Sequence, residues 1–309
     1  MHSKGLAYFV AVLTALLYSA WYISMSFLAN TYTGTYTPIF VLLLMFLVLL
    51  VLRLFPSRNR LHLYYATDIA YPAISGLFYA LGNYLFYVVI FKHGVQFASS
   101  FGSAEIVFFV LFLLLAGKQK TRMGYYLLGS LLIATGLITE SAVLGGVAIS
   151  INASMLAYGF LIALTYGIAT YFYYLSTKKI ESVWGTIFYV TFFEAATYFL
   201  LFVFLYKSIA IPRLDLSFAL LLGVASGILF VAFLAETVMM KLLEPFGEGT
   251  TATGYILSDL ELLPVMFYAV YLNPSTWLSF VPGMILITAG MALLDWRKGS
   301  NDEQRLTAP

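Results

Sequence analysis

Five acidic residues lie within long apolar stretches of this 309-residue chain: Glu105, Glu194, Glu236, Asp259 and Glu261. Counted by the rise per helical residue, Glu105 lies about 16–18 Å from each end of its stretch, near the centre of a bilayer. An ionised carboxylate at that depth costs about 2.5–3.5 kcal/mol on insertion scales. No Lys or Arg lies centrally in any of these stretches. Each acid therefore has to be protonated, face water or bind a cation.

Grouped carboxylates of this kind can bind protons and cations in turn, because burial and mutual repulsion both favour the protonated carboxyl. A proton-coupled exporter needs such a site, since substrate and proton then compete for the same negative charge. We expect Glu105 and Asp259 to serve this role together. The alternative is a protonated carboxyl that hydrogen-bonds a neighbouring helix. Glu194 could do either, and Glu236 could instead extend to the cytoplasmic interface.

The spacing of Asp259 and Glu261 limits what the two can do together. They are two residues apart, and a continuous helix turns by about 200° over two residues. We therefore expect only one of them to face a shared cavity.

Aromatic and amide residues in the same stretches could complete a binding site. Asn83 follows Tyr79 by one helical turn, which predicts a polar and aromatic cavity face. The alternative for Asn83 is an interhelical hydrogen bond, which polar residues in membrane helices often make. Aromatic faces attract organic cations, so Tyr18, Trp21 and Tyr166 are further cavity candidates. Tyr and Trp are also enriched at membrane interfaces, which is the competing interpretation.

Other conspicuous residues indicate structural roles. Tyr173 and Tyr174 lie near the end of an apolar stretch, and we expect them in an aromatic belt at the membrane interface. Gly223 and Gly227 form a GxxxG pattern, which is typical of close helix packing.

Composition excludes a soluble domain, because the chain is 62% apolar and only 10% charged, where soluble proteins are about 25% charged. Without cysteine there are no disulfides and no zinc–thiolate sites. The three histidines are dispersed, and no phosphate-binding loop or dinucleotide-binding glycine motif occurs. We expect no enzyme, metal, cofactor or nucleic-acid partner. The chain is instead expected to be an all-α, multi-pass integral protein of the plasma membrane, with lipid, small molecules and protons as partners.

Hydropathy predicts ten transmembrane helices. They cover residues 5–29, 35–54, 69–92, 95–116, 122–140, 152–175, 183–206, 217–241, 249–272 and 276–294. With the N-terminus in the cytoplasm, thirteen Lys and Arg residues fall on the inner side and three on the outer side. This asymmetry follows the positive-inside rule and favours ten spans with both termini inside.

Matching motifs occur in the two halves of the chain. The segments 129–136 and 283–290 each carry two glycines separated by six mostly apolar residues, at an offset of 154 residues. The same offset pairs further residues: Phe101 with Tyr255, Glu105 with Asp259, and Gly82-Asn83 with Glu236-Thr237. We therefore interpret the chain as an internal repeat.

The number of helices sets the topology of this repeat. Each half holds five predicted helices, and because five is odd the second half enters the membrane from the opposite side. We predict a 5+5 inverted-topology repeat with residues 1–148 and 149–294 as its halves, followed by a polar cytoplasmic tail at 295–309.

These features resemble the drug/metabolite transporter superfamily in its ten-helix EamA-type form, over nearly the whole chain. The resemblance rests on the 5+5 layout, the two Gly-x6-Gly helices, the small-residue-rich starts of the fourth and ninth spans, and a sixth span followed by Lys178-Lys179. Where the family usually carries a proline in its fourth and ninth spans, this chain has Val107 and Glu261, as in a divergent member. The resemblance implies a central cavity lined by the third, fourth, eighth and ninth spans, with the fifth and tenth peripheral.

Three functions follow as hypotheses. The first is a proton-coupled exporter of small cationic or amphipathic molecules that works by alternating access. The second is an uncoupled facilitator or exchanger of neutral or zwitterionic metabolites, such as amino acids, in which the carboxylates are structural. The third, a membrane-embedded enzyme or sensor, is disfavoured because no interfacial His or Asp cluster occurs. We expect a monomer or a homodimer.

Overall fold

The computed structural model describes residues 4–31, 37–54, 66–93, 101–116, 123–144, 153–205, 215–261 and 277–295, with a few positions between 263 and 274. Every regular element within these residues is a helix, which confirms the all-α class for this part of the chain. The helices are α1 (Lys4–Thr31), α2 (Thr37–Leu54), α3 (Ala66–His93), α5 (Glu105–Ala116), α6 (Met123–Leu144), α7 (Ala153–Lys179), α8 (Val183–Leu205), α9 (Leu216–Leu243), the 3-10 turn η2 (Glu244–Phe246), α10 (Glu248–Ser258) and α12 (Trp277–Asp295).

Several of these helices have the length and apolarity that a membrane requires. Four stretches within the described residues are long and apolar enough to cross one: Lys4–Ser24, Leu156–Lys179, Val183–Leu201 and Leu216–Phe246. Shorter apolar helices cover Leu43–Leu52, Phe101–Ala116, Gly124–Thr139 and Trp277–Leu293. Large apolar side chains such as Phe9 and Phe199 are about two-thirds exposed, at 65% and 64%, as lipid-facing side chains are. These features support a helical membrane protein.

The predicted fourth helix is interrupted close to an acid. Residues 101–103 are helical, Ala104 forms a turn, and α5 begins at Glu105. The N–H of Val107 donates to the carbonyl oxygen of Ala104 at 3.2 Å, which closes the first turn of α5. The other predicted helices, apart from the ninth, match single helices to within a few residues.

The predicted ninth helix, 249–272, is also interrupted. Its first part, α10, ends at Ser258, and residues 259–261 form a turn. The first N–H of this turn donates to the carbonyl oxygen of Tyr255 at 3.0 Å. The carbonyl oxygen of Glu261, which has left the helix, accepts a hydrogen bond from the hydroxyl of Ser19 in α1. Irregular backbone at membrane depth is tolerated where protein groups satisfy it in this way. The expectation of one continuous helix was therefore wrong.

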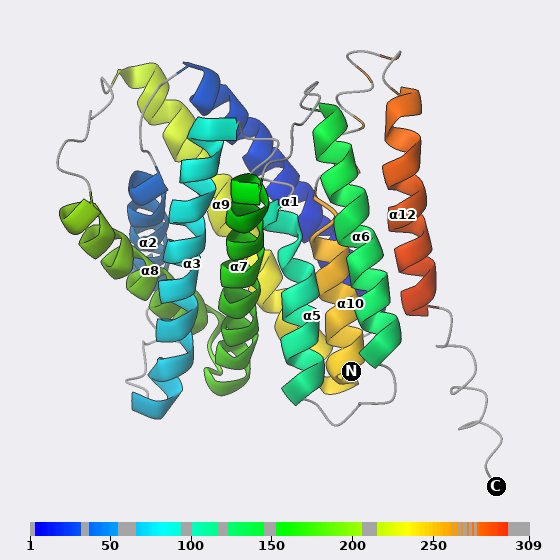
Figure 1. Cartoon of the computed structure of the whole chain (residues 1–309). Coiled ribbons are helices and arrows are strands. Elements are labelled where there is room, and N and C mark those ends of the chain that lie inside the picture. The colour runs from blue at the N-terminus through cyan, green and yellow to red at the C-terminus, as the bar shows by residue number, and fades with distance from the viewer. Residues whose placement is uncertain are drawn as a thin grey trace, which may run out of the picture.

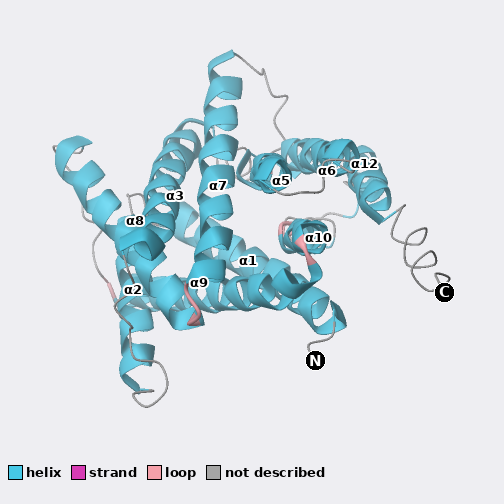
Figure 2. Ribbon diagram, turned by 90° about the horizontal axis from the view of Figure 1, so that it is seen from below, coloured by secondary structure: helices cyan, strands magenta, loops and turns pink. Residues whose placement is uncertain are grey.

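The helices form a bundle with two distinct edges. α6 packs against α12 at one edge, and α2 packs against α8 at the other (Figure 1, Figure 2). Between these edges α3 packs on α7 and α8, while α9 packs on α1 and α2. α5 contacts α7 and α10, and α10 contacts α1. The two interrupted segments thus lie side by side in the middle of the bundle.

Glycines bring α6 and α12 into direct backbone contact. A Cβ atom at Gly136 would lie 2.7 Å from the carbonyl oxygen of Gly283, and one at Gly290 would lie 2.6 Å from the carbonyl oxygen of Gly129. No side chain fits there, so the two Gly-x6-Gly motifs are the surfaces on which these helices touch.

Side chains fill the bundle centre near the end of α7. Tyr173 and Tyr174 are 0% and 2% exposed, so they do not form part of a lipid-facing belt, and that prediction was wrong. The Tyr173 hydroxyl is hydrogen-bonded to Thr237 of α9, and its ring packs edge-on against Tyr79 of α3, with centroids 6.2 Å apart. Three helices therefore meet without a gap at this level.

A lysine joins the end of α7 to α9. The Lys241 ammonium donates to the carbonyl oxygens of Thr177 at 2.7 Å and Ile180 at 2.8 Å. Helix C-termini leave carbonyls without helical partners, and a cation satisfies them and complements the helix dipole. The lysine thus caps α7 from a neighbouring helix.

Candidate functional site

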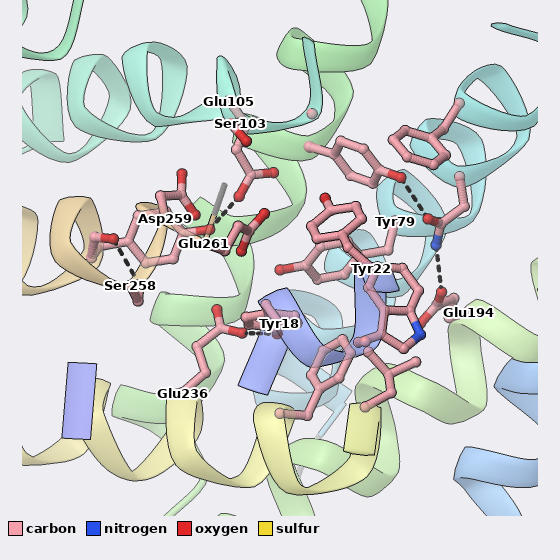
Figure 3. Close-up of a pocket in the computed structure, with 18 of the residues that line it drawn as sticks. Tyr18, Tyr22, Tyr79, Ser103, Glu105, Glu194, Glu236, Ser258, Asp259 and Glu261 are labelled. Carbon is pink, nitrogen blue, oxygen red and sulfur yellow. Dashed lines mark hydrogen bonds between the residues drawn. The ribbon is translucent and has the colours of Figure 1, made fainter. Parts of the chain in front are cut away.

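A buried cavity lies where the interruptions next to α5 and α10 meet α1, α3, α7, α8 and α9 (Figure 3). Its volume is about 120 Å³, roughly ten times the ~10–15 Å³ that one water needs. All ten residues singled out from the sequence line it: Tyr18, Trp21, Tyr79, Asn83, Glu105, Tyr166, Glu194, Glu236, Asp259 and Glu261. Their role in binding stays a prediction.

Glu105 is held by side chains from two other helices. The hydroxyl of Tyr255 in α10 donates to its Oε1, and the hydroxyl of Thr170 in α7 donates to the same oxygen at 3.2 Å. Thr170 Oγ1 also lies 3.2 Å from the Tyr255 hydroxyl and 3.0 Å from the Tyr79 hydroxyl of α3. This network fixes the Glu105 carboxyl in one position.

Asp259 and Glu261 both line the cavity. The expectation that only one could do so assumed a continuous helix, and the turn at these residues removes that constraint. Tyr22 of α1 also lines the cavity and interacts electrostatically with the Glu261 side chain. Asp259 interacts electrostatically with Glu105, Glu236 and Glu261. Its Oδ2 atom is buried and has no hydrogen-bond partner among the described residues.

Glu236 points into the bundle rather than towards the cytoplasmic interface. It is 3% exposed, and its Oε2 accepts a hydrogen bond of 2.5 Å from the hydroxyl of Tyr18 in α1. Its Oε1 atom is buried and, within the described part of the chain, has no partner. Buried polar atoms are nearly always hydrogen-bonded, so this oxygen and Oδ2 of Asp259 both indicate a site for a ligand or water.

Glu194 belongs to a separate polar chain. The Nδ2 atom of Asn83 donates to its Oε1 at 2.9 Å, and the Tyr166 hydroxyl donates to Oδ1 of Asn83 at 2.5 Å. A Cβ atom at Gly76 of α3 would lie 2.6 Å from the Glu194 backbone nitrogen, so α3 and α8 touch here. Asn83 therefore makes the interhelical hydrogen bond that was its alternative role, and it also lines the cavity.

Aromatic rings form a second part of the cavity wall. Tyr79 packs against Tyr166 and Phe233 with ring centroids 6.2 Å and 6.1 Å apart, and Tyr18 packs edge-on against Phe233 at 6.3 Å. The indole N–H of Trp21 has no hydrogen-bond partner among the described residues. The rings thus offer an apolar surface with a free donor beside it.

Four of the five acids lie together on one side of the cavity, and Glu194 lies across from them (Figure 3). Figure 3 shows Glu105, Asp259 and Glu236 grouped on one side, with Tyr79 and Tyr22 across from them. None of the lining residues that the structure describes is Lys, Arg or His. In the same part of the chain, no group of acids and histidines is placed to hold a metal ion. When these acids ionise, no cation among the described lining residues balances their charge.

The sequence interpretation missed five polar contributors to this site. Tyr255 and Thr170 hold Glu105, and Tyr22, Ser103 and Ser258 line the cavity. A signal was present for Tyr255, because the 154-residue offset pairs it with Phe101. Thr170 gave no signal, since a threonine in an apolar helix is ordinary.

Comparison with known proteins adds the fold and no activity. No protein-family model matches the sequence, and none of the curated proteins matches it. A solved structure described only as "Crystal structure of protein" is similar to this chain, with a TM-score of 0.67 and 16% sequence identity over 99% of this chain and 100% of that one. The likeness shows a shared fold over the full length of both chains.

Proposed function

We propose that this chain is a secondary transporter that exports small cationic or amphipathic molecules by alternating access, with protons as the coupling ion. One observation carries the proposal. Two interrupted helices present Glu105 and Asp259 to one buried cavity, where no basic residue of the described lining neutralises them. In secondary transporters, discontinuous helices at corresponding places of two repeats form the binding site near the midplane.

Competition at the acids supplies the coupling. Oδ2 of Asp259 has no partner within the described protein, so it can take a proton or accept a hydrogen bond from a cation, but not both. On the proton-rich side of the membrane, protonation releases the cation. On the other side, the cation displaces the proton. A ligand shifts a conformational equilibrium only through such a difference in affinity.

The 5+5 inverted repeat forms part of the same proposal. Helices that the repeat makes equivalent have equivalent neighbours: α3 packs on α7 and α8 as α9 packs on α1 and α2, and α5 packs on α7 as α10 packs on α1. Tyr79 and Phe233, which the 154-residue offset pairs, touch each other with ring centroids 6.1 Å apart. Mutual contact of paired residues is expected close to a two-fold axis. If the two halves exchange their conformations, the cavity then opens to the opposite side of the membrane.

Membership of the drug/metabolite transporter superfamily, in its EamA-type form, is proposed on the same grounds. The peripheral α6–α12 pair and the cavity lining from α3, α5, α9 and the turn after α10 support it. Both termini would then lie in the cytoplasm and the helices in the plasma membrane.

Proton flux in liposomes tests this function. The full chain is reconstituted with a trapped pH-sensitive dye, and cationic, zwitterionic and neutral metabolites are added in turn. We expect cations to drive proton movement, and we expect Glu105→Gln and Asp259→Asn to abolish it. Asp215→Asn is the matched control, because Asp215 is an exposed N-cap of α9 and Asn caps helices equally well.

Two results would contradict the mechanism. Full coupled flux in both acid variants would show that these carboxylates take no part in the coupling. Substrate flux that ignores the pH gradient would favour the uncoupled facilitator of neutral or zwitterionic metabolites.

A further inference from the structure

We propose that the cavity selects one class of substrate, a small primary amine with an aromatic body, and that it excludes molecules carrying a carboxylate, amino acids included. The ammonium group lies at the acid side and the ring at the aromatic side. This inference rests on the proposed transport function and adds to it the charge, size and orientation of the ligand.

The acid side offers two acceptors that the described protein leaves unused, Oδ2 of Asp259 and Oε1 of Glu236. Their residues are only 7% and 3% exposed, and an unpaired buried polar atom is costly. A primary ammonium has three N–H donors. It can therefore satisfy both oxygens and still donate to a third acceptor such as Glu261, which the electrostatic coupling of Asp259 places nearby.

Two of the other acids are already supplied with donors. Glu105 accepts from Tyr255 and Thr170, and Glu194 accepts from Asn83. The two free acceptors belong to acids that interact electrostatically with each other. This arrangement fits a single cationic head at the acid side.

The aromatic side fits the body of such a ligand. Tyr79, Phe233, Trp21 and Phe86 line it, and rings prefer offset or edge-to-face contact with other rings. The cavity volume of about 120 Å³ leaves room for one small molecule. A ring on a short linker to an ammonium group suits a cavity of this volume whose wall contains both acids and rings.

Charge explains the exclusion of amino acids. A carboxylate on the ligand would enter a buried site that holds five acids and, among its described lining residues, no Lys, Arg or His. An unpaired buried charge is strongly unfavourable. A bare metal ion is also a poor candidate, since no group of described residues is placed to ligate one.

Four compounds that share a phenyl ring on a short linker separate these effects: phenethylamine, 2-phenylethanol, phenylacetate and the larger phenylalanine. Their affinities for the full chain in detergent are measured at neutral pH by isothermal titration calorimetry. We expect phenethylamine to bind at least about tenfold more tightly than 2-phenylethanol and phenylalanine, from its charge-assisted hydrogen bonds, and phenylacetate not to bind. Equal binding of phenylalanine or 2-phenylethanol, or no binding of phenethylamine, would overturn the inference.

Two variants locate the ammonium group. Asp259→Asn and Glu236→Gln should each weaken the binding of phenethylamine by about tenfold or more. The affinity for 2-phenylethanol should stay unchanged. The matched controls are Asp215→Asn and Glu244→Gln, which neutralise exposed acids outside the cavity. An equal loss in the controls, or no loss in the cavity variants, would contradict the placement.

Flux through liposomes separates this inference from the proposed function. Preferential flux of phenylalanine would overturn the amine class and leave the transporter intact. Tight phenethylamine binding without any flux would overturn the transporter and leave the binding site.

Discussion

The central cavity and the α6–α12 edge differ in the forces that hold them together. At the edge, glycines let backbone meet backbone, with Gly136 against Gly283 and Gly290 against Gly129. In the centre, buried acids meet hydroxyls and rings, and oxygens of Asp259 and Glu236 have no partner among the described residues. The edge is satisfied by its own packing, whereas the centre is incomplete without a ligand, protons or water.

This difference bears on how evenly the proposed repeat keeps its sequence. The glycine motifs are nearly the same in the two halves, because each motif supplies one side of the same helix–helix contact. In the centre the same offset pairs two acids, Glu105 and Asp259, but it also pairs Gly82 with Glu236. The glycine contact is therefore matched throughout, whereas the site is matched only in part.

The largest effect on stability is expected at the α6–α12 edge. Gly136→Ala and Gly290→Ala insert a methyl group against a backbone oxygen, and overpacking of this kind costs about 1–3 kcal/mol per site. Thermal unfolding in detergent measures the loss. Gly124→Ala is the control on the same helix, because no described atom lies within 4 Å of its Cβ position. An equal loss of stability in the control would mean that the effect of alanine on the helix backbone, and not the contact between the helices, causes the loss.

A gain of stability is expected in the centre. Asp259→Leu removes a buried oxygen without a partner, which should raise the free energy of unfolding by about 1–2 kcal/mol while abolishing transport. The same change at Asp215 should lower stability by about 1 kcal/mol, because it removes a helix N-cap. A large loss of stability in Asp259→Leu would show that Asp259 is structural.

A smaller loss is expected when the support of Glu105 is weakened. Thr170→Val keeps the shape of the side chain but removes the hydroxyl that contacts Glu105, Tyr255 and Tyr79. The free energy of unfolding should fall by about 1 kcal/mol. Thr135→Val is the control, since that hydroxyl bonds only the Leu131 carbonyl of its own helix at an exposed position. Chemical or thermal unfolding compares the two, and no difference between them would contradict the network.

The smallest effect is expected at the Glu194 chain. Asn83→Leu breaks the link between Tyr166 and Glu194, and interhelical hydrogen bonds in membranes average about 0.6 kcal/mol. The free energy of unfolding should fall by that amount, and the flux of phenethylamine should fall less than it does in Asp259→Asn. A complete loss of flux would instead move the essential proton site to Glu194.

Much of the fold and the site could be predicted from sequence, for separate reasons. Apolar length gave most helix boundaries, and acids in apolar stretches are conspicuous enough that all five were singled out as candidates. Only one of Asp259 and Glu261 was expected at the cavity, and Glu236 could have extended to the interface, whereas both pairs of expectations give way to a cavity lined by all five acids. The GxxxG pair of α9 was misleading, because neither Gly223 nor Gly227 has a described atom within 4 Å of its Cβ position. Pattern alone does not say which glycine meets a neighbour.

The interruption after α10 and the partners of Glu105 could not be predicted. The carbonyl freed at Glu261 is satisfied by Ser19, 242 residues away in sequence. Thr170 and Tyr255 lie 65 and 150 residues from Glu105. Such contacts depend on how the helices are placed in space, which local patterns do not encode.

The interruption of the two helices also sets their polarity towards the cavity. α5 begins at Glu105 and so presents its N-terminal, positive end, while α10 finishes at Ser258 and presents its C-terminal, negative end. The two half-helices run antiparallel, with 12 and 11 residues each. The positive pole faces the acid that hydroxyls already hold, and the negative pole faces the acid that has a free oxygen. The backbone itself therefore favours a cation beside Asp259, even when the carboxyls are neutral.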